Sequence, residues 1–152
     1  MSAIALAAAS VPEHHYTHHQ GRGATPHRSN PAVIHRELGT LEVGPGLNVV
    51  EFGTGSGYSG ALLAQLVGPT GQVTSLDVDT YLTRWANLIH HERGLDNIRC
   101  HTADGTAGFP ARAPYTGWWP GAPHRSCPRH GSTRSSTAAS SSPRCRSPPC
   151  PT

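Results

Sequence analysis

The sequence contains no lysine, so all 12 of its basic residues are arginine. Arginine has GC-rich codons and lysine does not, which indicates a GC-rich gene. Acidic residues are also absent after Asp104, whereas six arginines follow it. A basic tail is typical of nucleic-acid binding, but this one has no interleaved aromatic residues beyond Trp119 and no helical pattern. We therefore expect no nucleic acid as a partner.

The sequence has few cysteine or histidine pairs at the spacing typical of metal ligands. The four cysteines form no CxxC pair, and neither a disulfide framework nor a zinc site is supported. The pairs His14 with His18 and His15 with His19 have helical spacing, which would suit a metal. Since no third ligand follows at matching spacing, we interpret these histidines as solvated loop residues and expect no metal.

Long hydrophobic runs are missing as well. Residues 3–9 are apolar, but the run is too short to span a bilayer and has no positive flank typical of a secretory signal. We predict an N-terminal helix here, in a cytoplasmic protein without membrane association.

Apolar residues are concentrated in the middle of the chain. Residues 116–152 contain no Val, Ile, Leu, Met or Phe, but seven Pro and eight Ser. Such a segment cannot bury enough apolar surface to offset its ordering entropy. The sequence thus predicts an irregular His-rich segment over 1–28, a half-domain over 29–115, and a disordered tail rich in Pro, Ser and Arg over 116–152.

Within the half-domain, strands and helices alternate. Hydrophobic patterns and breakers predict strands at 47–52, 73–78 and 98–102, and helices from Pro31 to the breakers at 44–46, at 58–67 and at 80–93. This alternation predicts an α/β fold, namely a partial Rossmann-like sheet of about three parallel strands. A ligand is then expected at the carboxyl ends of the strands.

A glycine-dense turn follows the first of these strands. The segment reads Val49-Val50-Glu51-Phe52-Gly53-Thr54-Gly55-Ser56-Gly57-Tyr58. Glycines let a ligand approach the backbone and leave amide groups free to bind it. Asp77 ends the next strand, about 20 residues further on, where an acid accepts hydrogen bonds from ribose hydroxyls. The pattern predicts a nucleotide-cofactor site. An NAD-dependent oxidoreductase is less favoured, because the turn is GxGxG and not GxGxxG.

With these motifs, the chain resembles the S-adenosylmethionine-dependent methyltransferases, specifically the protein-L-isoaspartate O-methyltransferase family. The resemblance covers residues 29–115. It is carried by Ser29-Asn30-Pro31, the glycine turn, Asn97-Ile98, Ala103-Asp104-Gly105-Thr106-Ala107-Gly108-Phe109-Pro110 and Ala113-Pro114-Tyr115. The glycine turn and the DGxxGxP segment at this separation are fairly specific for the family.

The resemblance implies S-adenosylmethionine as the cofactor and isoaspartyl residues of damaged proteins as methyl acceptors. It places Ser29 beside the acceptor, Asp77 at the ribose and Asp104 at the adenine amino group. The family usually has Glu at the Asp77 position, and the shorter Asp side chain keeps a carboxylate that accepts hydrogen bonds. The implied cofactor-binding residues are Glu51, Gly53, Thr54, Gly55, Gly57, Tyr58, Asp77, Asp104 and Gly105.

Several of these residues have alternative roles. Glu51 could brace the glycine turn, Asp104 could be an ordinary turn residue, and Ser29 could cap the following helix. The methyl acceptor could also be another peptide carboxylate. Alternatively, the chain could be a non-catalytic cofactor-binding fragment whose basic, Cys-containing tail contacts nucleic acid or metal.

After Tyr115 the sequence departs from the family pattern. GC-rich codons for Tyr-Asp-Arg-Leu-Val-Ala-Trp-Cys, with one base deleted, encode Tyr-Thr-Gly-Trp-Trp-Pro-Gly, the residues at 115–121. Our hypothesis is a frameshifted tail, which predicts a truncated sheet, marginal stability and impaired catalysis. Sequencing the locus tests it, because the idea fails if no one-base change restores a long open frame.

Overall fold

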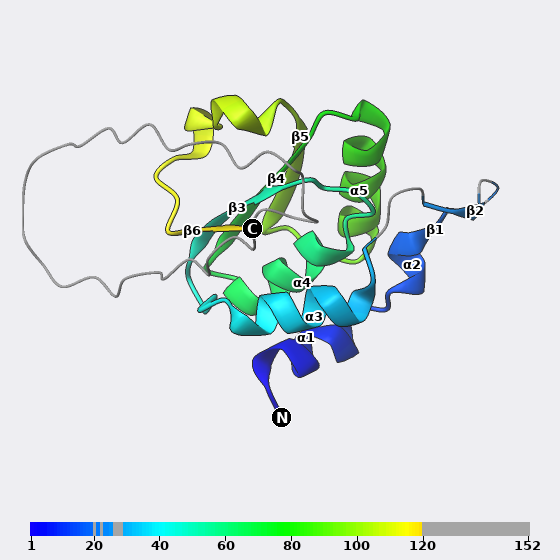
Figure 1. Cartoon of the computed structure of the whole chain (residues 1–152), viewed down its shortest axis with the longest axis horizontal. Coiled ribbons are helices and arrows are strands. Elements are labelled where there is room, and N and C mark those ends of the chain that lie inside the picture. Colours follow the sequence, from blue (N-terminus) through cyan, green and yellow to red (C-terminus); the bar gives the residue numbers. More distant parts are fainter. Residues whose placement is uncertain (20, 22, 26–28, 120–152) are drawn as a thin grey trace, which may run out of the picture.

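The computed structural model describes residues 1–19, 21, 23–25 and 29–119, and its centre is a four-stranded sheet (Figure 1). The strand order is β5-β4-β3-β6, and every neighbouring pair is parallel. The strands are β3 (Asn48–Phe52), β4 (Gln72–Asp77), β5 (Ile98–Thr102) and β6 (Gly117–Trp119). Because all four run in the same direction, their carboxyl ends share one edge of the sheet.

Two helices connect strands β3, β4 and β5. They are α4 (Tyr58–Val67) and α5 (Thr80–Glu92). Helix α4 is apolar on most sides, and Leu62, Leu63 and Val67 are fully buried. Helix α5 begins where the Asp79 carboxylate accepts hydrogen bonds from the amides of Tyr81 and Leu82. These elements match the predicted α/β alternation to within a residue or two at each end.

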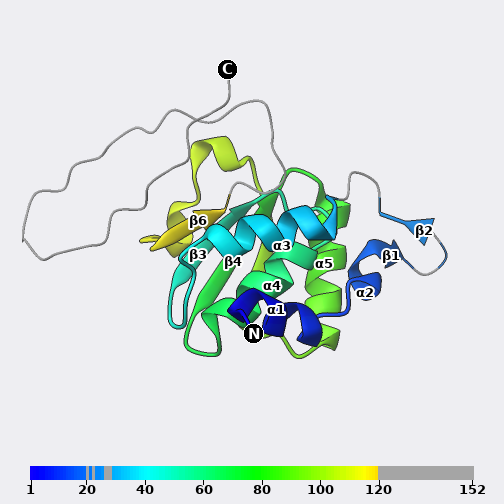
Figure 2. The same ribbon diagram turned by 60° about the horizontal axis from the view of Figure 1, so that its bottom comes forward.

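Helices α1 (Ala3–Ser10) and α3 (Pro31–Thr40) lie beside α4 (Figures 1 and 2). Both predicted helices are present, although α3 ends at Thr40, before the breakers at 44–46 where we expected its end. Helix α3 places Ile34 and Leu38 in the core. Within the part of the chain that the structure describes, no helix has the length and apolarity needed to cross a membrane.

The N-terminal segment is more regular than the sequence indicated. After α1 it forms α2 (His14–Thr17) and an antiparallel pair of two-residue strands, β1 (His18–His19) and β2 (Gly23–Ala24). The prediction of an irregular segment is wrong here, and so is a solvated role for His19. Its ring is 4% exposed and stacks on Trp85 of α5 with centroids 3.9 Å apart.

The C-terminal part of the described chain adds a strand that we did not expect. Two short 3₁₀ helices, η1 (Gly105–Ala107) and η2 (Pro110–Arg112), lead from β5 back to β6 beside β3. The Thr116 amide donates to the Asn48 carbonyl at 2.8 Å and starts this pairing. The predicted tail therefore begins later than 116. Residues 120–152, on which most of the disorder and frameshift hypotheses depend, lie outside the described residues.

Candidate functional site

The glycine turn between β3 and α4 lies at the carboxyl edge of the sheet. Gly53, Gly55 and Gly57 have φ values of 90°, 51° and 85°, a region that other residues rarely adopt. A Cβ atom built on Gly53 or Gly55 would meet no atom within 4 Å, whereas one on Gly57 would lie 2.8 Å from the Ala86 Cβ. The first two glycines thus border open space, and the third is required for packing against α5.

Hydrogen bonds within the protein already occupy much of this turn. The amides of Gly53 and Thr54 donate to the Leu76 carbonyl at 2.7 and 3.2 Å, and the Gly57 amide donates to the Thr54 carbonyl at 2.8 Å. The prediction that the turn leaves its amides free is wrong for these three groups, because β4 pairs with the chain beyond the end of β3 and the turn itself closes on the Thr54 carbonyl. What the turn offers a ligand is mainly unfilled space along its backbone.

Asp77 connects the end of β4 to this turn. Its Oδ2 atom accepts a hydrogen bond from the Gly55 amide at 3.0 Å, and its Oδ1 atom accepts one from the Asp79 amide at 3.0 Å. The carboxylate is half-buried and retains lone pairs for further donors. The structure therefore places a negative charge beside the open space at Gly55, as a ribose-binding acid requires.

Glu51 lies behind the turn. Its side chain is 0% exposed, and both carboxylate oxygens accept hydrogen bonds from serine hydroxyls, Ser59 on Oε1 and Ser75 on Oε2. Burial raises the pKa of Glu51 to about 7, while the two serine hydrogen bonds oppose that rise and the negative charge of Asp77 adds to it. Of the two roles considered for Glu51, the geometry favours bracing over direct contact.

The DGxxGxP segment follows β5 at the same edge. The Asp104 Oδ1 atom accepts hydrogen bonds from the Thr106 amide at 2.9 Å and hydroxyl at 2.7 Å, and these bonds lower the pKa of Asp104. This is the turn role that the sequence left open, and the exposed carboxylate is also available to a ligand. A Cβ atom on Gly105 would lie 2.3 Å from the Phe52 ring, so this glycine lets the segment pack on the end of β3.

Tyr58 and Ser29 occupy the region around α3. The Tyr58 ring is buried, and its hydroxyl lies 2.8 Å from His35 Nε2, which ties α4 to α3. Its side chain therefore points into the packing and not toward the turn surface. Ser29 is half-buried just before α3, but the helix cap is Asn30, whose Oδ1 accepts from the Ala32 amide at 2.9 Å. The alternative role of Ser29 as the cap is wrong.

Few sequence features indicate the polar residues beneath the turn. Ser75 is 0% exposed in the middle of β4, and a serine inside a predicted buried strand is the signal that was available. His90 is the other unexpected residue. It is 1% exposed, its Cε1 atom would lie 3.4 Å from a Cβ on Gly57, and burial lowers its pKa to about 4. A neutral imidazole thus supports the turn from α5.

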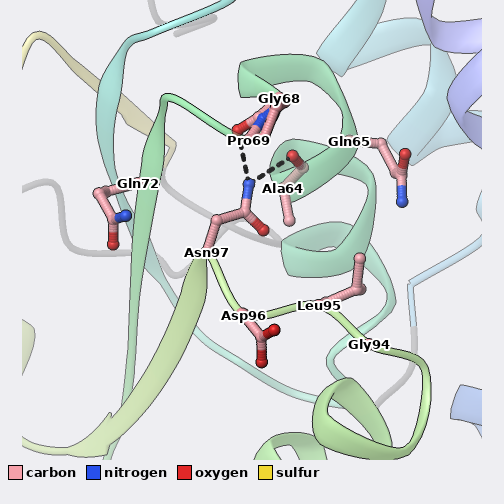
Figure 3. A pocket seen from close by; sticks show the side chains of 9 residues that line it. All are labelled: Ala64, Gln65, Gly68, Pro69, Gln72, Gly94, Leu95, Asp96 and Asn97. Atoms are coloured by element: carbon pink, nitrogen blue, oxygen red, sulfur yellow. Dashed lines mark hydrogen bonds between the residues drawn. The ribbon is translucent and has the colours of Figure 1, made fainter.

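A hollow of about 450 Å³ lies at the opposite edge of the sheet, near the start of β4 and β5 (Figure 3). Gln65, Gln72 and Asp96 line it, and the Asn97 side-chain amide donates to the carbonyls of Ala64 and Gly68, both at 2.8 Å. Those bonds close the carboxyl end of α4. The hollow is remote from the glycine turn and from both predicted binding acids, so we do not assign it to the cofactor.

The parallel sheet, the open glycine turn and the acids after β4 and β5 define the fold of the S-adenosylmethionine-dependent methyltransferases. The model of one family matches residues 7–132, which is most of the sequence. The chain belongs to the protein-L-isoaspartate(D-aspartate) O-methyltransferase family.

Individual relatives agree with this membership. A protein-L-isoaspartate O-methyltransferase of Ruegeria pomeroyi is 41% identical over 87 residues, which are 57% of this chain and 39% of the relative. A solved protein-L-isoaspartate O-methyltransferase superposes with a TM-score of 0.69 at 21% identity, covering 78% of this chain and 43% of the other.

A second solved structure shares the fold at lower identity. It is a Plasmodium falciparum protein assigned to the same methyltransferase type, in complex with S-adenosyl-L-homocysteine, with a TM-score of 0.59 and 14% identity. The match covers 74% of this chain and 60% of that one. This chain spans about two fifths of the length of the curated relatives that it matches.

Proposed function

We propose that this chain binds S-adenosylmethionine at the glycine turn and that its activity is methyl transfer to the carboxylate of isoaspartyl residues in damaged proteins or peptides. The observation that carries the proposal is the open space at Gly53 and Gly55 beside the Asp77 carboxylate. Family membership supplies the substrate class. The residues fit the cofactor, because a side chain at either glycine would fill the space that the cofactor needs.

The binding roles follow from where each group lies. Gly53 and Gly55 would border the methionine end, and Asp77 would accept the ribose hydroxyls with lone pairs that its backbone donors leave over. Asp104 would face the adenine amino group from the end of β5. Ser29 would lie beside the acceptor carboxylate. Glu51, Thr54 and Tyr58 would support the turn from behind.

When bound, S-adenosylmethionine supplies a methyl group attached to a positively charged sulfur. Transfer of the methyl group leaves that sulfur as a neutral thioether. The protein's contribution is then mostly to hold the acceptor carboxylate in line with that methyl group and to exclude competing water. The carboxylates of Asp77 and Glu51 also favour a cationic ligand at this edge. We infer no need for a metal or for a covalent nucleophile.

We propose further that cofactor binding is better preserved than methyl transfer. The residues assigned to the cofactor all lie between 51 and 105, within the described part of the chain. The sequence beyond residue 120 contains no Val, Ile, Leu, Met or Phe, so it offers little apolar surface for enclosing a peptide substrate.

Two measurements test these proposals separately. Calorimetric titration with S-adenosylhomocysteine should show saturable binding, and its absence would contradict the cofactor proposal. Methyl-ester formation should then be measured on an isoaspartyl peptide, with the same peptide containing ordinary aspartate as the matched control. Transfer to both peptides alike would favour a methyltransferase of another peptide carboxylate. Binding without any transfer would favour the non-catalytic fragment.

A further inference from the structure

A buried chain of hydroxyl groups joins Glu51 to the glycine turn. Ser75 of β4 lies 2.6 Å from the Glu51 Oε2 atom, and the Ser75 and Thr54 hydroxyls lie 2.7 Å apart. Thr54 belongs to the turn itself and is 2% exposed. Ser59, from the first turn of α4, hydrogen-bonds the other carboxylate oxygen. The carboxyl group is thus connected to both sides of the turn without reaching its open surface.

The charge of Glu51 determines which hydroxyl donates and which accepts in these hydrogen bonds, because each hydroxyl has a single proton to donate. When Glu51 is ionised, Ser75 must donate to Oε2 and therefore accepts the proton of Thr54. When Oε2 carries a proton, it can donate to Ser75, which then donates to Thr54. The Thr54 hydroxyl must in that case point its proton elsewhere. Ionised Glu51 therefore holds Thr54 in one orientation.

We propose that Glu51 is a positioning residue that senses the positive charge of the cofactor from behind the turn, releases a proton when the cofactor binds, and thereby fixes Thr54 through Ser75. This inference rests on the proposed function, since it requires S-adenosylmethionine to bind at this turn.

The surroundings of Glu51 make its charge sensitive to a new cation. Two titratable groups face it within the described residues, Asp77 at the end of β4 and Cys100 on β5. Asp77 contributes negative charge, and burial raises the pKa of Cys100 to about 12, which keeps that thiol neutral. From α4, Ser59 and the backbone of Gly60 approach the carboxyl, and from β6, Trp119 lies opposite Glu51 in the ladder. None of these groups is a cation.

The pKa of about 7 places both forms of Glu51 within reach at neutral pH. A cation that enters the turn stabilises the ionised form and lowers this pKa, so binding must release protons and strengthen as the pH rises. S-adenosylhomocysteine provides the matched ligand. It lacks the methyl group and with it the sulfonium charge, and it is otherwise the same molecule.

The test is calorimetric titration of the full chain with S-adenosylmethionine and with S-adenosylhomocysteine, in buffers of different ionisation enthalpy. We expect proton release with S-adenosylmethionine near neutral pH and clearly less with S-adenosylhomocysteine. The ratio of the two affinities should rise about two- to threefold between about pH 6 and about pH 8, the change that a half-unit decrease in the Glu51 pKa produces. Equal proton release with both ligands would overturn the inference.

Two variants separate sensing from positioning. Glu51→Gln should abolish the difference in proton release, and its persistence in a folded variant would overturn the assignment to Glu51. Ser75→Ala keeps the carboxyl but cuts its link to Thr54, so proton release should persist while the affinity for both ligands falls severalfold. Unchanged affinity in Ser75→Ala would overturn the positioning role. The wild-type comparison of ligands needs neither variant to fold, and failure of both ligands to bind would contradict the proposed function instead.

Discussion

Glycine serves two different purposes around the turn after β3. Gly53 and Gly55 border open space, whereas Gly57 and Gly60 lie where any side chain would overlap a neighbour. A Cβ atom on Gly60 would lie 2.8 Å from both Glu51 Oε2 and the Ile98 Cδ1 atom. The glycines of this region therefore look alike in the sequence, although some border open space and others are needed for close packing. Only the structure distinguishes the two kinds.

Gly55→Ala should weaken S-adenosylhomocysteine binding at least about tenfold with a stability cost near 1 kcal/mol, the usual penalty for a left-handed residue. Gly57→Ala should instead destabilise by about 2 kcal/mol or more, because overlap with Ala86 is added to the strain. Calorimetric titration and urea unfolding measure the two effects.

The matched control is Gly68→Ala, which has φ +65° and open space like Gly55 but lies at the far end of α4. It should lose at least as much stability, because its ψ of −174° lies in a region almost restricted to glycine, and it should lose no binding. Equal loss of binding in Gly68→Ala and Gly55→Ala would contradict the assignment of the open space to the cofactor.

Asp77→Asn should reduce S-adenosylhomocysteine affinity about 10- to 100-fold, the range expected when charge-assisted hydrogen bonds are lost. The substitution removes the charge and turns one acceptor of the side chain into a donor, which also disturbs the bond to the Gly55 amide. Asp79→Asn removes the same charge two residues away but leaves a good helix cap, so its affinity should be nearly unchanged. Comparable losses in both variants would indicate a general charge effect and not a ribose contact.

At the residue scale, sequence patterns located the two acids that we propose bind the cofactor, but not the residues beneath them. Asp77 lies at the end of one predicted strand and Asp104 follows another, so their position at the carboxyl edge could be predicted. The burial of Glu51 could not, because the same glutamate would face the ligand or the core depending on small rotations of β3. Its partners Ser59 and Ser75 come from α4 and β4, and only the packing of these elements brings them together.

Among the secondary-structure elements, strand β5 is an edge strand whose outward backbone groups are covered by a side chain. The Asn87 amide of α5 donates to the Cys100 carbonyl at 2.8 Å, and the Asn87 Oδ1 atom accepts from the Cys100 amide at 2.9 Å. These two bonds imitate those of a neighbouring strand. They protect part of the edge from pairing with another molecule.

Replacing Asn87 with Ala should cost about 1 to 3 kcal/mol, because the replacement leaves two part-buried backbone groups of Cys100 without their partner. It should also increase self-association, which sedimentation at several concentrations would detect. Leu88→Ala is the control on the same helix, since Leu88 is 48% exposed and should change neither property by much. Unaltered stability in Asn87→Ala would mean that water replaces the side chain without loss.

The elements that sequence patterns predicted are those with local signals. Strands β3, β4 and β5 each contain buried apolar residues and begin within two residues of a glycine or asparagine, and α4 and α5 have regular apolar faces. Strand β6 was missed because its three residues, Gly117–Trp119, form no hydrophobic alternation and gain their conformation from β3. The β1–β2 pair was missed for a similar reason, since the stacking of His19 on a distant helix has no sequence signature.

For the molecule as a whole, two buried groups oppose each other in their effect on stability. The pKa of Glu51 is raised from 4.5 to about 7, so between these values the folded state binds more protons and the free energy of unfolding falls as pH rises. The pKa of His90 is lowered from 6.5 to about 4, so over that range the unfolded state binds more protons and stability rises with pH. Each effect amounts to about 3 kcal/mol over its full range.

The two slopes should largely cancel in the wild-type chain between about pH 4.5 and about pH 6.5. Glu51→Gln should therefore reveal stability that rises with pH, and His90→Leu should reveal stability that falls with pH. The double variant should lose both dependences. Urea unfolding followed by tryptophan fluorescence at a series of pH values measures these slopes, and slopes of the same sign in the two single variants would contradict the assignment.

The long connection between β3 and β6 governs the order in which the sheet can assemble. Asn48 at the start of β3 contacts the approaching segment through the Arg112 and Pro114 carbonyls and through Thr116, which lies 68 residues later in the chain. A ribosome making this protein completes β3 and β4 well before β6 is made. During that interval β3 has a β4 partner on one side and an open edge on the other. The nascent chain is therefore most open to chaperones, or to other nascent chains, along β3, the strand that leads into the glycine turn.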